Sequence, residues 1–365
     1  MEIQVRMYFL SLFVTALVTT HVHATEVHCN RLCLKQMVDQ VLVSTEKHDP
    51  SILPVADRYR LTVNNMPSSL SMAVPWRTIS SFKAVAPGNY VIDTERQEVF
   101  FVSTVVEGSL PSLLWGRLKV KDRKLSEMEF YLSRGTADSG AKFDPNGLTK
   151  LPSVWTHPIP PGKQATRAEL TRVAQTIFNP GMGELDYSLS CHLVENGYTL
   201  PNTVRLDDWL KYNASSVSKE KLVELKAMAS SHNGIAELGC PRIDAPTDKQ
   251  ARILVDEVQG IALSLAMVPG KVIADLMPSP DPKPGLPTTV FVPDSMANDQ
   301  SQRIENEREL PTSHGRPVSL TMPAVLAAAQ FIKFYDGRMQ GVRRLMQGQP
   351  AGSKSPWVGD KHRVQ

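Results

Sequence analysis

The stretch LKVKDRKLSEMEFYL, residues 118–132, decides how the chain is expected to fold. Strand-like runs flank the short charged group KDRK, a pattern typical of two antiparallel strands joined by a tight turn. The stretch IKFYDGRMQGVRRLM, residues 332–346, aligns with it and pairs Asp336 with Asp122, an offset of 214 residues that holds across the whole strand-turn-strand. We therefore predict that one structural element occurs twice in the chain.

A second pair of segments supports this internal repeat. VIDTERQEVFFVSTVVEG (91–108) aligns with LVDEVQGIALSLAMVPG (254–270), which pairs Asp93 with Asp256 at an offset of 163 residues. A polar, Pro-rich insertion at residues 278–317 absorbs the difference between the two offsets. We expect this insertion to form a long mobile loop.

Each copy of the element is preceded by a helical segment. Apolar residues follow Cys33 at helical spacing, and TRAELTRVAQTIF (166–178) begins with a Thr and a Glu at the spacing of a capping box. A helix followed by long antiparallel strands is typical of the α+β class, a curved, mainly antiparallel sheet wrapped on helices. The predicted order is a signal peptide at 1–24, a first domain at 25–135, a Pro/Gly-rich linker at 136–164, a second domain at 165–346 and a disordered tail at 347–365.

The N-terminal segment is typical of a secretory signal peptide. It contains Arg6, an apolar run from Met7 to Val18 and the group VHA, with cleavage expected after Ala24. The run is short for a membrane span, and no later segment is long and apolar enough for one, so we expect a soluble secreted or periplasmic protein. The net charge of +3 is small for 365 residues and no long basic run occurs, so nucleic-acid binding has little support.

Export makes disulfides a natural use of the 4 Cys. Cys191 and Cys240 could close a loop of 49 residues, which stabilises by about 4 kcal/mol in the simple entropy model. Cys29 and Cys33 are spaced like neighbours on a helix, whose Cβ atoms lie ~5–6 Å apart, beyond the usual disulfide range. A bridge between them needs a frayed helix start, and both outcomes stay open. A zinc site is not indicated, because no His pair completes either cysteine set.

Three quoted segments resemble the secreted SnoaL-like family of fungi and bacteria: CLKQMVDQVLVSTEKHDPSILPVA (33–56), VPW (74–76) and GRLKVKDRKLSEMEFYLSR (116–134). The resemblance covers most of residues 29–134, and more loosely 166–270 and 319–346. It implies two cone-shaped domains with the fold of nuclear transport factor 2, in which a bent sheet and its helices accept a small, mostly apolar molecule. Members include cyclases, dehydratases, isomerases, lyases and non-catalytic modules, so the site must decide the function.

The family's T-E-N and G-D-G-L-W segments correspond here to TVNN (62–65) and MAVPW (72–76). Asn64 and Trp76 match the pattern, whereas Val63 and Ala73 stand where the family has carboxylates. Neither Val nor Ala exchanges a proton, so acid/base chemistry at these positions is excluded in the first domain.

The second domain keeps more of the family's pattern. CHLVENG (191–197) matches a Cys followed by E-N-G, and RILVDE (252–257) matches a basic-apolar-Asp-Glu strand. Cys240 stands at the family's second cysteine, so the resemblance implies a disulfide between Cys191 and Cys240.

Glu195 and Asp256 are the candidate catalytic carboxylates. A lone Glu in an apolar cone loses hydration, so its pKa rises and it exchanges protons near neutral pH, as a cofactor-free dehydratase, isomerase or lyase requires. The alternative is that ENG forms a turn with Glu195 at its solvated edge, because Asn-Gly favours positive φ. Asp256, which stands ahead of VQG, has a similar alternative in a hairpin turn.

The candidate ligand-binding residues are Asn64, Trp76, Trp115, Arg117, His192 and Asn196. His192 and Glu195 could pair to make a base held in one tautomer, but strand alternation would put the two on opposite faces, and a surface histidine is the alternative. Arg117 either meets an anionic ligand inside the cone or pairs with Glu127 or Glu129 on the next strand. Trp76 and Trp115 either line a pocket or belong to the core.

We expect a secreted protein that binds a small organic molecule, aromatic or polyketide-like, in an apolar cone without a cofactor. One alternative is a cofactor-free lyase, isomerase or cyclase that uses the carboxylates of the second domain. Another is a non-catalytic structural or interaction module, whose cones are filled by their own side chains. A homodimer is a further partner to consider, whereas nucleic acid and, after signal removal, membrane are not expected.

Overall fold

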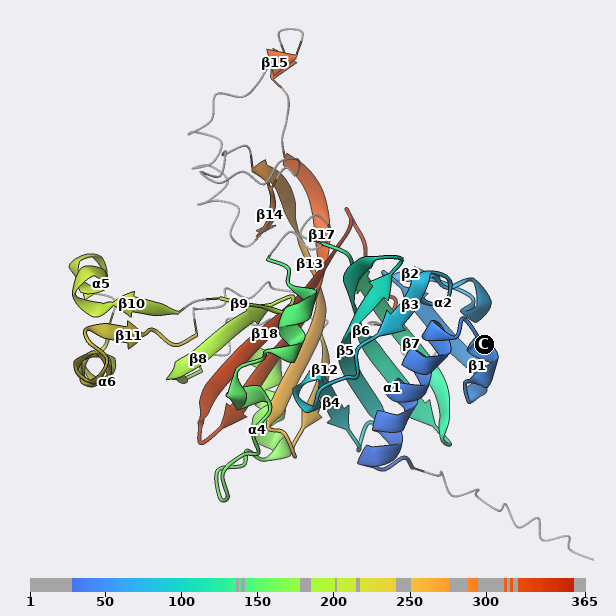
Figure 1. The fold of residues 1–365 in the computed structure, drawn as a ribbon, viewed down its shortest axis with the longest axis horizontal. Coiled ribbons are helices and arrows are strands. Elements are labelled where there is room, and N and C mark those ends of the chain that lie inside the picture. Colours follow the sequence, from blue (N-terminus) through green and yellow to red (C-terminus); the bar gives the residue numbers. More distant parts are fainter. Residues whose placement is uncertain are drawn as a thin grey trace, which may run out of the picture.

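The structure is a computed structural model and describes residues 28–135, 138, 142–177, 185–200, 202–214, 217–240, 251–275, 288–294, 312–313, 316–317 and 321–357. These residues form a mixed α+β fold with mostly strands, few helices and open sheets (Figure 1). The predicted signal peptide lies outside the described residues. Within the described part of the chain, no helix has the length and apolar character needed to cross a membrane.

The first half of the chain forms a seven-stranded sheet in the order β2-β1-β7-β6-β5-β3, with β4 paired to β5. Strand β1 runs parallel to β7, and the other pairings are antiparallel. The strands are β1 (Val55–Val63), β2 (Met66–Pro67), β3 (Ile79–Phe82), β4 (Tyr90–Asp93), β5 (Glu98–Glu107), β6 (Leu110–Lys121) and β7 (Lys124–Ser133). Helices α1 (Arg31–Glu46) and α2 (Val74–Thr78) belong to the same half.

The second half forms another seven-stranded sheet with the same plan, in the order β12-β13-β17-β18-β8-β9, with β14 paired to β13. Strand β8 runs parallel to β18, as β1 does to β7. The strands are β8 (Tyr187–Glu195), β9 (Tyr198–Thr199), β12 (Arg252–Asp256), β13 (Ile261–Asp275), β14 (Thr288–Pro293), β17 (Thr321–Tyr335) and β18 (Arg338–Pro350). The strands predicted at 118–132 and 332–346 are thus β6–β7 and β17–β18.

Both of these hairpins turn at the residues that the alignment pairs. Asp122 and Arg123 have φ of 49° and 59°, and Asp336 and Gly337 have φ of 57° and 72°. Two consecutive residues with positive φ are the hallmark of a tight hairpin turn, which Asp and Gly tolerate well. Local turn chemistry therefore fixes the strand register in both copies.

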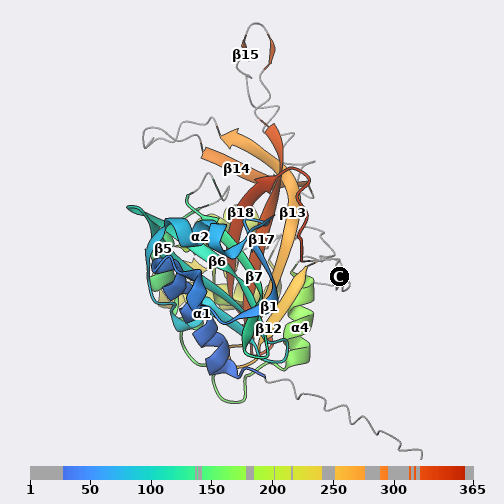
Figure 2. The same ribbon diagram turned by 90° about the vertical axis from the view of Figure 1, so that its right-hand side faces the viewer.

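Each half packs one helix on one face of its sheet. Helix α1 buries Leu34, Val38, Val41 and Leu42 in the core of the first half, and α4 (Arg167–Thr176) buries Leu170 and Val173 in that of the second. The capping box predicted at the start of α4 is present, with Thr166 and Glu169 bonded to each other's backbone N–H groups. Figure 2 shows α1 and α4 on opposite sides of the two sheets.

The remaining face of each sheet packs against the other sheet. Phe100 of β5 meets Phe331 of β17 edge to face, with ring centroids 5.2 Å apart. Trp115 and Tyr131 stack at 4.2 Å in the same layer. The apolar cluster between the sheets also includes Val91, Val102, Leu113, Leu254, Ile261, Leu263, Leu265, Met267, Val325, Ala327, Ala329 and Leu345. The two halves therefore share one buried core in addition to their own.

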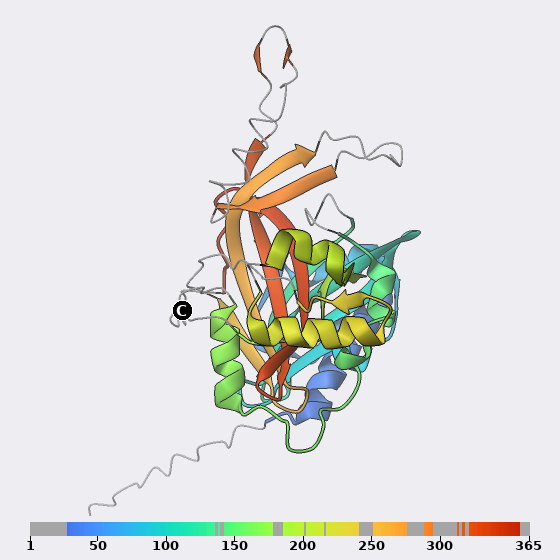
Figure 3. The same cartoon turned by 90° about the vertical axis from the view of Figure 1, so that its left-hand side faces the viewer.

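A small unit packs beside the second sheet, and Leu189 of β8 belongs to its core (Figures 1 and 3). It consists of α5 (Leu206–Asn213), α6 (Lys219–Ser231), β10 (Thr203–Arg205) and β11 (Ile235–Glu237), around a core that includes Leu206, Leu225 and Ala236. The repeat did not predict this unit, because the first half has no counterpart for it.

Both cysteine pairs form disulfides, Cys29–Cys33 and Cys191–Cys240. Cys29 precedes the N-cap Asn30 and so lies outside the regular helix, which lets its Cα lie 5.2 Å from that of Cys33. Two disulfides are consistent with an extracellular or otherwise oxidising environment.

The structure adds detail to three predicted segments, namely the linker, the insertion and the tail. The linker is not merely a spacer, because its short helices η4 (Pro145–Thr149) and η5 (Ser153–Trp155) bury Leu148 and Trp155 between the sheets. The insertion at 278–317 is not entirely loop, because β14 pairs with β13; short β15 (Thr312–Ser313) and β16 (Arg316–Pro317) pair with each other. Residues 278–287, 295–311 and 314–315 of the insertion lie outside the described residues.

The tail is not disordered from Gln347 onward. Strand β18 continues through Pro350 on β17, and the chain reaches back to the first half, where Trp357 is buried. The Trp357 indole N–H donates to Thr62 Oγ1 at 3.0 Å. Residues 358–365 lie outside the described residues.

Candidate functional site

Glu195 is not a lone carboxylate. It ends β8 opposite Arg344 of β18, whose Nη1 donates to its Oε1 at 3.2 Å. The equivalent pair in the first half is Val63 opposite Phe130. An ion pair in the second half thus replaces an apolar pair in the first. This exchange of partners explains why Glu195 stands where the first half has Val63, and no catalytic role is needed.

Asn64 and Asn196 hold the same turn in the two halves. Both have positive φ, of 46° and 43°. Asn64 donates its backbone N–H to Phe130 O and accepts from Leu132 N at 2.8 Å. Asn196 likewise donates to Arg344 O and accepts through Oδ1 from Met346 N at 2.8 Å. In each half the asparagine hydrogen-bonds the turn after β1 or β8 to the neighbouring parallel strand, so its role here is structural.

Asp256 does not meet Glu195. Their strands lie at positions one and five of the second sheet, which corresponds to about 19 Å across four strand spacings. Asp256 is fully buried and accepts hydrogen bonds from both terminal nitrogens of Arg31, at 2.8 and 2.9 Å, and from the backbone N–H of Ile92 at 2.9 Å. It therefore joins the second half to α1 and β4 of the first.

Asp93 makes the reciprocal contact. This buried residue ends β4, as Asp256 ends β12, and accepts from Arg167 Nη2 at 2.8 and 3.0 Å. It also accepts from the backbone N–H of Val255 at 3.1 Å. Arg31 and Arg167 are the first residues of α1 and α4, so each half offers a helix-start arginine to the strand-end aspartate of the other. We call these two contacts the reciprocal clamps.

Arg117 and Trp115 face the sheet-to-sheet core rather than the interior of a domain. Arg117 is fully buried and lies 2.6 Å from Glu127, 3.3 Å from Glu129 and 3.4 Å from Glu98. The ion-pair alternative predicted for Arg117 is therefore observed. Burial alone would lower the pKa of Arg117, but the three carboxylates raise it. Burial would likewise raise the pKa of Glu98, but Arg117 and Arg252 hold it below its usual value.

Trp76 and His192 occupy unrelated places. Trp76 is buried in the core of the first half, where its indole N–H donates to Ser44 Oγ at 2.7 Å and its ring lies 5.8 Å from Phe130. His192 is half-buried, with Nε2 4.0 Å from Glu237 Oε1, and does not bond Glu195. The predicted binding residues thus do not converge on one cavity.

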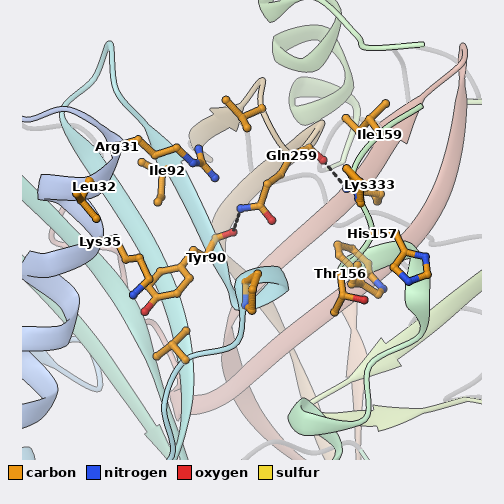
Figure 4. A pocket seen from close by; sticks show the side chains of 15 residues that line it. Arg31, Leu32, Lys35, Tyr90, Ile92, Thr156, His157, Ile159, Gln259 and Lys333 are labelled. Atoms are coloured by element: carbon orange, nitrogen blue, oxygen red, sulfur yellow. Dashed lines mark hydrogen bonds between the residues drawn. The ribbon is translucent and has the colours of Figure 1, made fainter. Parts of the chain in front are cut away.

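A cavity of about 580 Å³ lies at the junction of the two halves (Figure 4). One wall comes from the start of α1 and from β4, and the other from the linker and β17; the β12–β13 turn lies between them (Figure 4). Its apolar lining residues are Leu32, Val85, Pro87, Tyr90, Ile92, Trp155, Pro158, Ile159 and Val258. Its polar lining residues are Arg31, Lys35, Thr156, His157, Gln259 and Lys333, and none of the described lining residues carries a carboxylate. We call this cavity the junction pocket.

The basic residues of the junction pocket are held by the clamps and turns around it. Arg31 is held by Asp256, and Lys35 by Asp39 at 2.9 Å. Lys333 is 2% exposed and donates from Nζ to Gln259 O at 2.6 Å. Gln259 in turn donates from Nε2 to Tyr90 O at 3.2 Å (Figure 4). Burial lowers the pKa of Lys333 to about 8, and nearby Asp256 only partly opposes that shift.

Lys333 was not among the predicted site residues. At the offset of 214 it aligns with Lys119, and an isolated lysine in a strand gives no sign of burial. Among the described residues, no cluster of His, Cys, Asp or Glu suitable for a metal ion occurs. No protein-family model matches the chain, and no curated protein matches it with significant similarity.

Proposed function

We propose that the chain is an exported protein with two SnoaL-like domains that binds a small, largely apolar organic acid. The ligand occupies the junction pocket rather than the interior of either cone. The observation that carries this proposal is the composition of the pocket: apolar and aromatic walls, with several basic side chains and no carboxylate among the described lining residues. Its volume of about 580 Å³ is in the range of small-molecule sites.

The charge balance around the pocket favours an anion. Three basic side chains, Arg31, Lys35 and Lys333, face two carboxylates, Asp256 and Asp39, which leaves one positive charge uncompensated below pH 8, where Lys333 is mostly protonated. A carboxylate that enters the pocket would offset this charge with charge-assisted hydrogen bonds. Tyr90 and Trp155 give the walls aromatic surface, so an aromatic carboxylic acid fits the chemistry.

The interiors of the two halves are less suitable ligand sites than the junction pocket. In the first half, side chains of α1, β6 and β7 and the ring of Trp76 are buried against one another. In the second half, Glu195 is neutralised by Arg344 and lies about four strand spacings from Asp256. A shared acid/base site in the second cone is therefore not the function we propose.

A second candidate is a structural or interaction module that uses no ligand. The buried core between the two sheets favours it, because this core needs no small molecule to fill it. This candidate and the binding proposal differ in what they predict for the junction pocket.

Calorimetric titration of the full chain with benzoate and with benzyl alcohol tests the proposal. The two ligands share the ring and differ in charge, so the acid should bind at least about tenfold more tightly, which is the value of one charge-assisted hydrogen bond. Binding of neither ligand would favour the structural module. Equal binding of both would refute the anionic specificity.

A further inference from the structure

Lys333 differs from the other basic residues of the junction pocket in its surroundings. Arg31 and Lys35 each contact a carboxylate, whereas Lys333 bonds a backbone carbonyl oxygen, that of Gln259. Among the described residues, no carboxylate lies within ion-pair distance of Lys333 Nζ. Its side chain is almost wholly buried, and it is one of the residues that line the pocket.

We propose that Lys333 forms an imine with ligands that carry an aldehyde or ketone, so that the junction pocket holds carbonyl-bearing organic acids by a reversible covalent bond. The inference rests on the proposed function, because the same pocket must admit the ligand. It goes further in naming the reacting atom, Lys333 Nζ, and the ligand class, a small oxo acid with an aromatic or other apolar body.

The reaction needs no partner beyond the amine and the carbonyl. The lone pair of neutral Nζ attacks the carbonyl carbon, and the C=O π electrons move to oxygen. Proton transfer from nitrogen to oxygen gives a carbinolamine, which loses water as the C=N bond forms. The sum is amine plus carbonyl giving imine plus water, and hydrolysis reverses it.

The surroundings of Lys333 favour the neutral amine that this step requires. With a pKa of about 8, about half of the Lys333 side chains are neutral at pH 8, against under about 1% for an ordinary lysine. The charged groups that face it are Asp256, which stabilises the ammonium form, and Arg31, which neutralises Asp256. Lys35 and His157 line the same pocket, and both disfavour a further positive charge when protonated.

Lys119 provides a matched control within the chain. It occupies the equivalent strand position in the first half, opposite Glu98 in the sheet, but its side chain is 38% exposed and lies 3.8 Å from that carboxylate. Its ammonium group is hydrated and paired with a carboxylate, so we expect it to react more slowly than Lys333. The two lysines therefore separate the effect of the pocket from that of the strand.

The test uses the full chain with 4-formylbenzoate and sodium cyanoborohydride at pH 8, followed by intact-mass analysis and peptide mapping. We expect a single reduced adduct on Lys333, formed at least about tenfold faster than on Lys119 or any other lysine. Peptide mapping separates this adduct from one on the α-amino group. Lys333→Arg should abolish it, whereas Lys119→Arg should leave it unchanged.

Labelling spread evenly over exposed lysines, or unchanged in Lys333→Arg, would overturn the inference. Mapping of the wild-type chain decides this even where a variant fails to fold. Excess benzoate should slow labelling of Lys333 by at least about tenfold, since it competes for the pocket. Benzoate binding without a Lys333 adduct would refute only the imine, whereas absent benzoate binding would refute the proposed function itself.

Discussion

Asp256→Asn should destabilise the protein strongly, because it breaks one of the two reciprocal clamps. Asp256 accepts hydrogen bonds from Arg31, from Ile92 N and from the backbone and side chain of Gln259. An asparagine offers one oxygen in place of two, and its NH₂ group faces donors. At least one buried donor is then left without an acceptor, and Arg31 loses its counter-charge.

The size of the effect follows from these contacts. Breaking a buried ion pair costs 3–5 kcal/mol in general, and Arg31 is partly exposed and regains some hydration. We therefore expect a loss of about 3 kcal/mol in the free energy of unfolding. Asp93→Asn removes the reciprocal clamp to Arg167 and Val255 and should cost a similar amount.

Urea denaturation of the full chain measures the effect as a lower midpoint with an unchanged slope. Asp57→Asn is the matched control, since its side chain is 98% exposed and its contact with Lys124 is loose, at 3.7 Å. It should change stability by less than about 0.5 kcal/mol. If Asp256→Asn and Asp93→Asn behaved like this control, the clamps would not hold the two halves together.

Three further predictions concern the second half and the tail. Glu195→Val and Arg344→Phe should each lower the free energy of unfolding by about 1–3 kcal/mol. The double variant copies the apolar pair of the first half, so its stability should lie within about 1 kcal/mol of the wild type. Additive losses in a double-mutant cycle would contradict this expectation. Trp357→Ala should cost about 3 kcal/mol by urea denaturation, because the ring is buried; a change below about 0.5 kcal/mol would mean that the tail does not pack. The pKa of Lys333 is lowered to about 8, so as pH rises the folded state loses this proton before the unfolded state does. The free energy of unfolding, relative to that of Lys333→Met, should therefore rise by up to about 3 kcal/mol between pH 8 and pH 10.5. A stability difference between the two proteins that does not change with pH would refute the lowered pKa of Lys333.

Much of the fold could be predicted because it depends on local signals. The alternation and turn residues at Asp122 and Asp336 predicted two hairpins, and both are present. The Thr166–Glu169 spacing predicted the start of α4. These features depend only on residues that are close together in the sequence, so the sequence alone is enough to predict them.

The site could not be predicted, because it depends on which distant residues meet. The sequence predicts Asp256 as a catalytic carboxylate, but its partner Arg31 stands 225 residues earlier. The same holds for the tail, where the Gln-rich end of β18 is a strand only because β17 extends beside it. The junction pocket combines five separate segments, and no local pattern in any of them indicates a cavity.

Benzoate titration of two tryptophan variants beside the wild type shows whether the ligand binds in the junction pocket. Val258 is 70% exposed at the junction pocket, so Val258→Trp adds a ring to the pocket without filling buried space. Val223 is 68% exposed on α6, away from the pocket, and Val223→Trp is the control. We expect at least about tenfold weaker benzoate binding in Val258→Trp and wild-type binding in Val223→Trp. Equal affinity in all three proteins would mean that benzoate does not bind in the junction pocket.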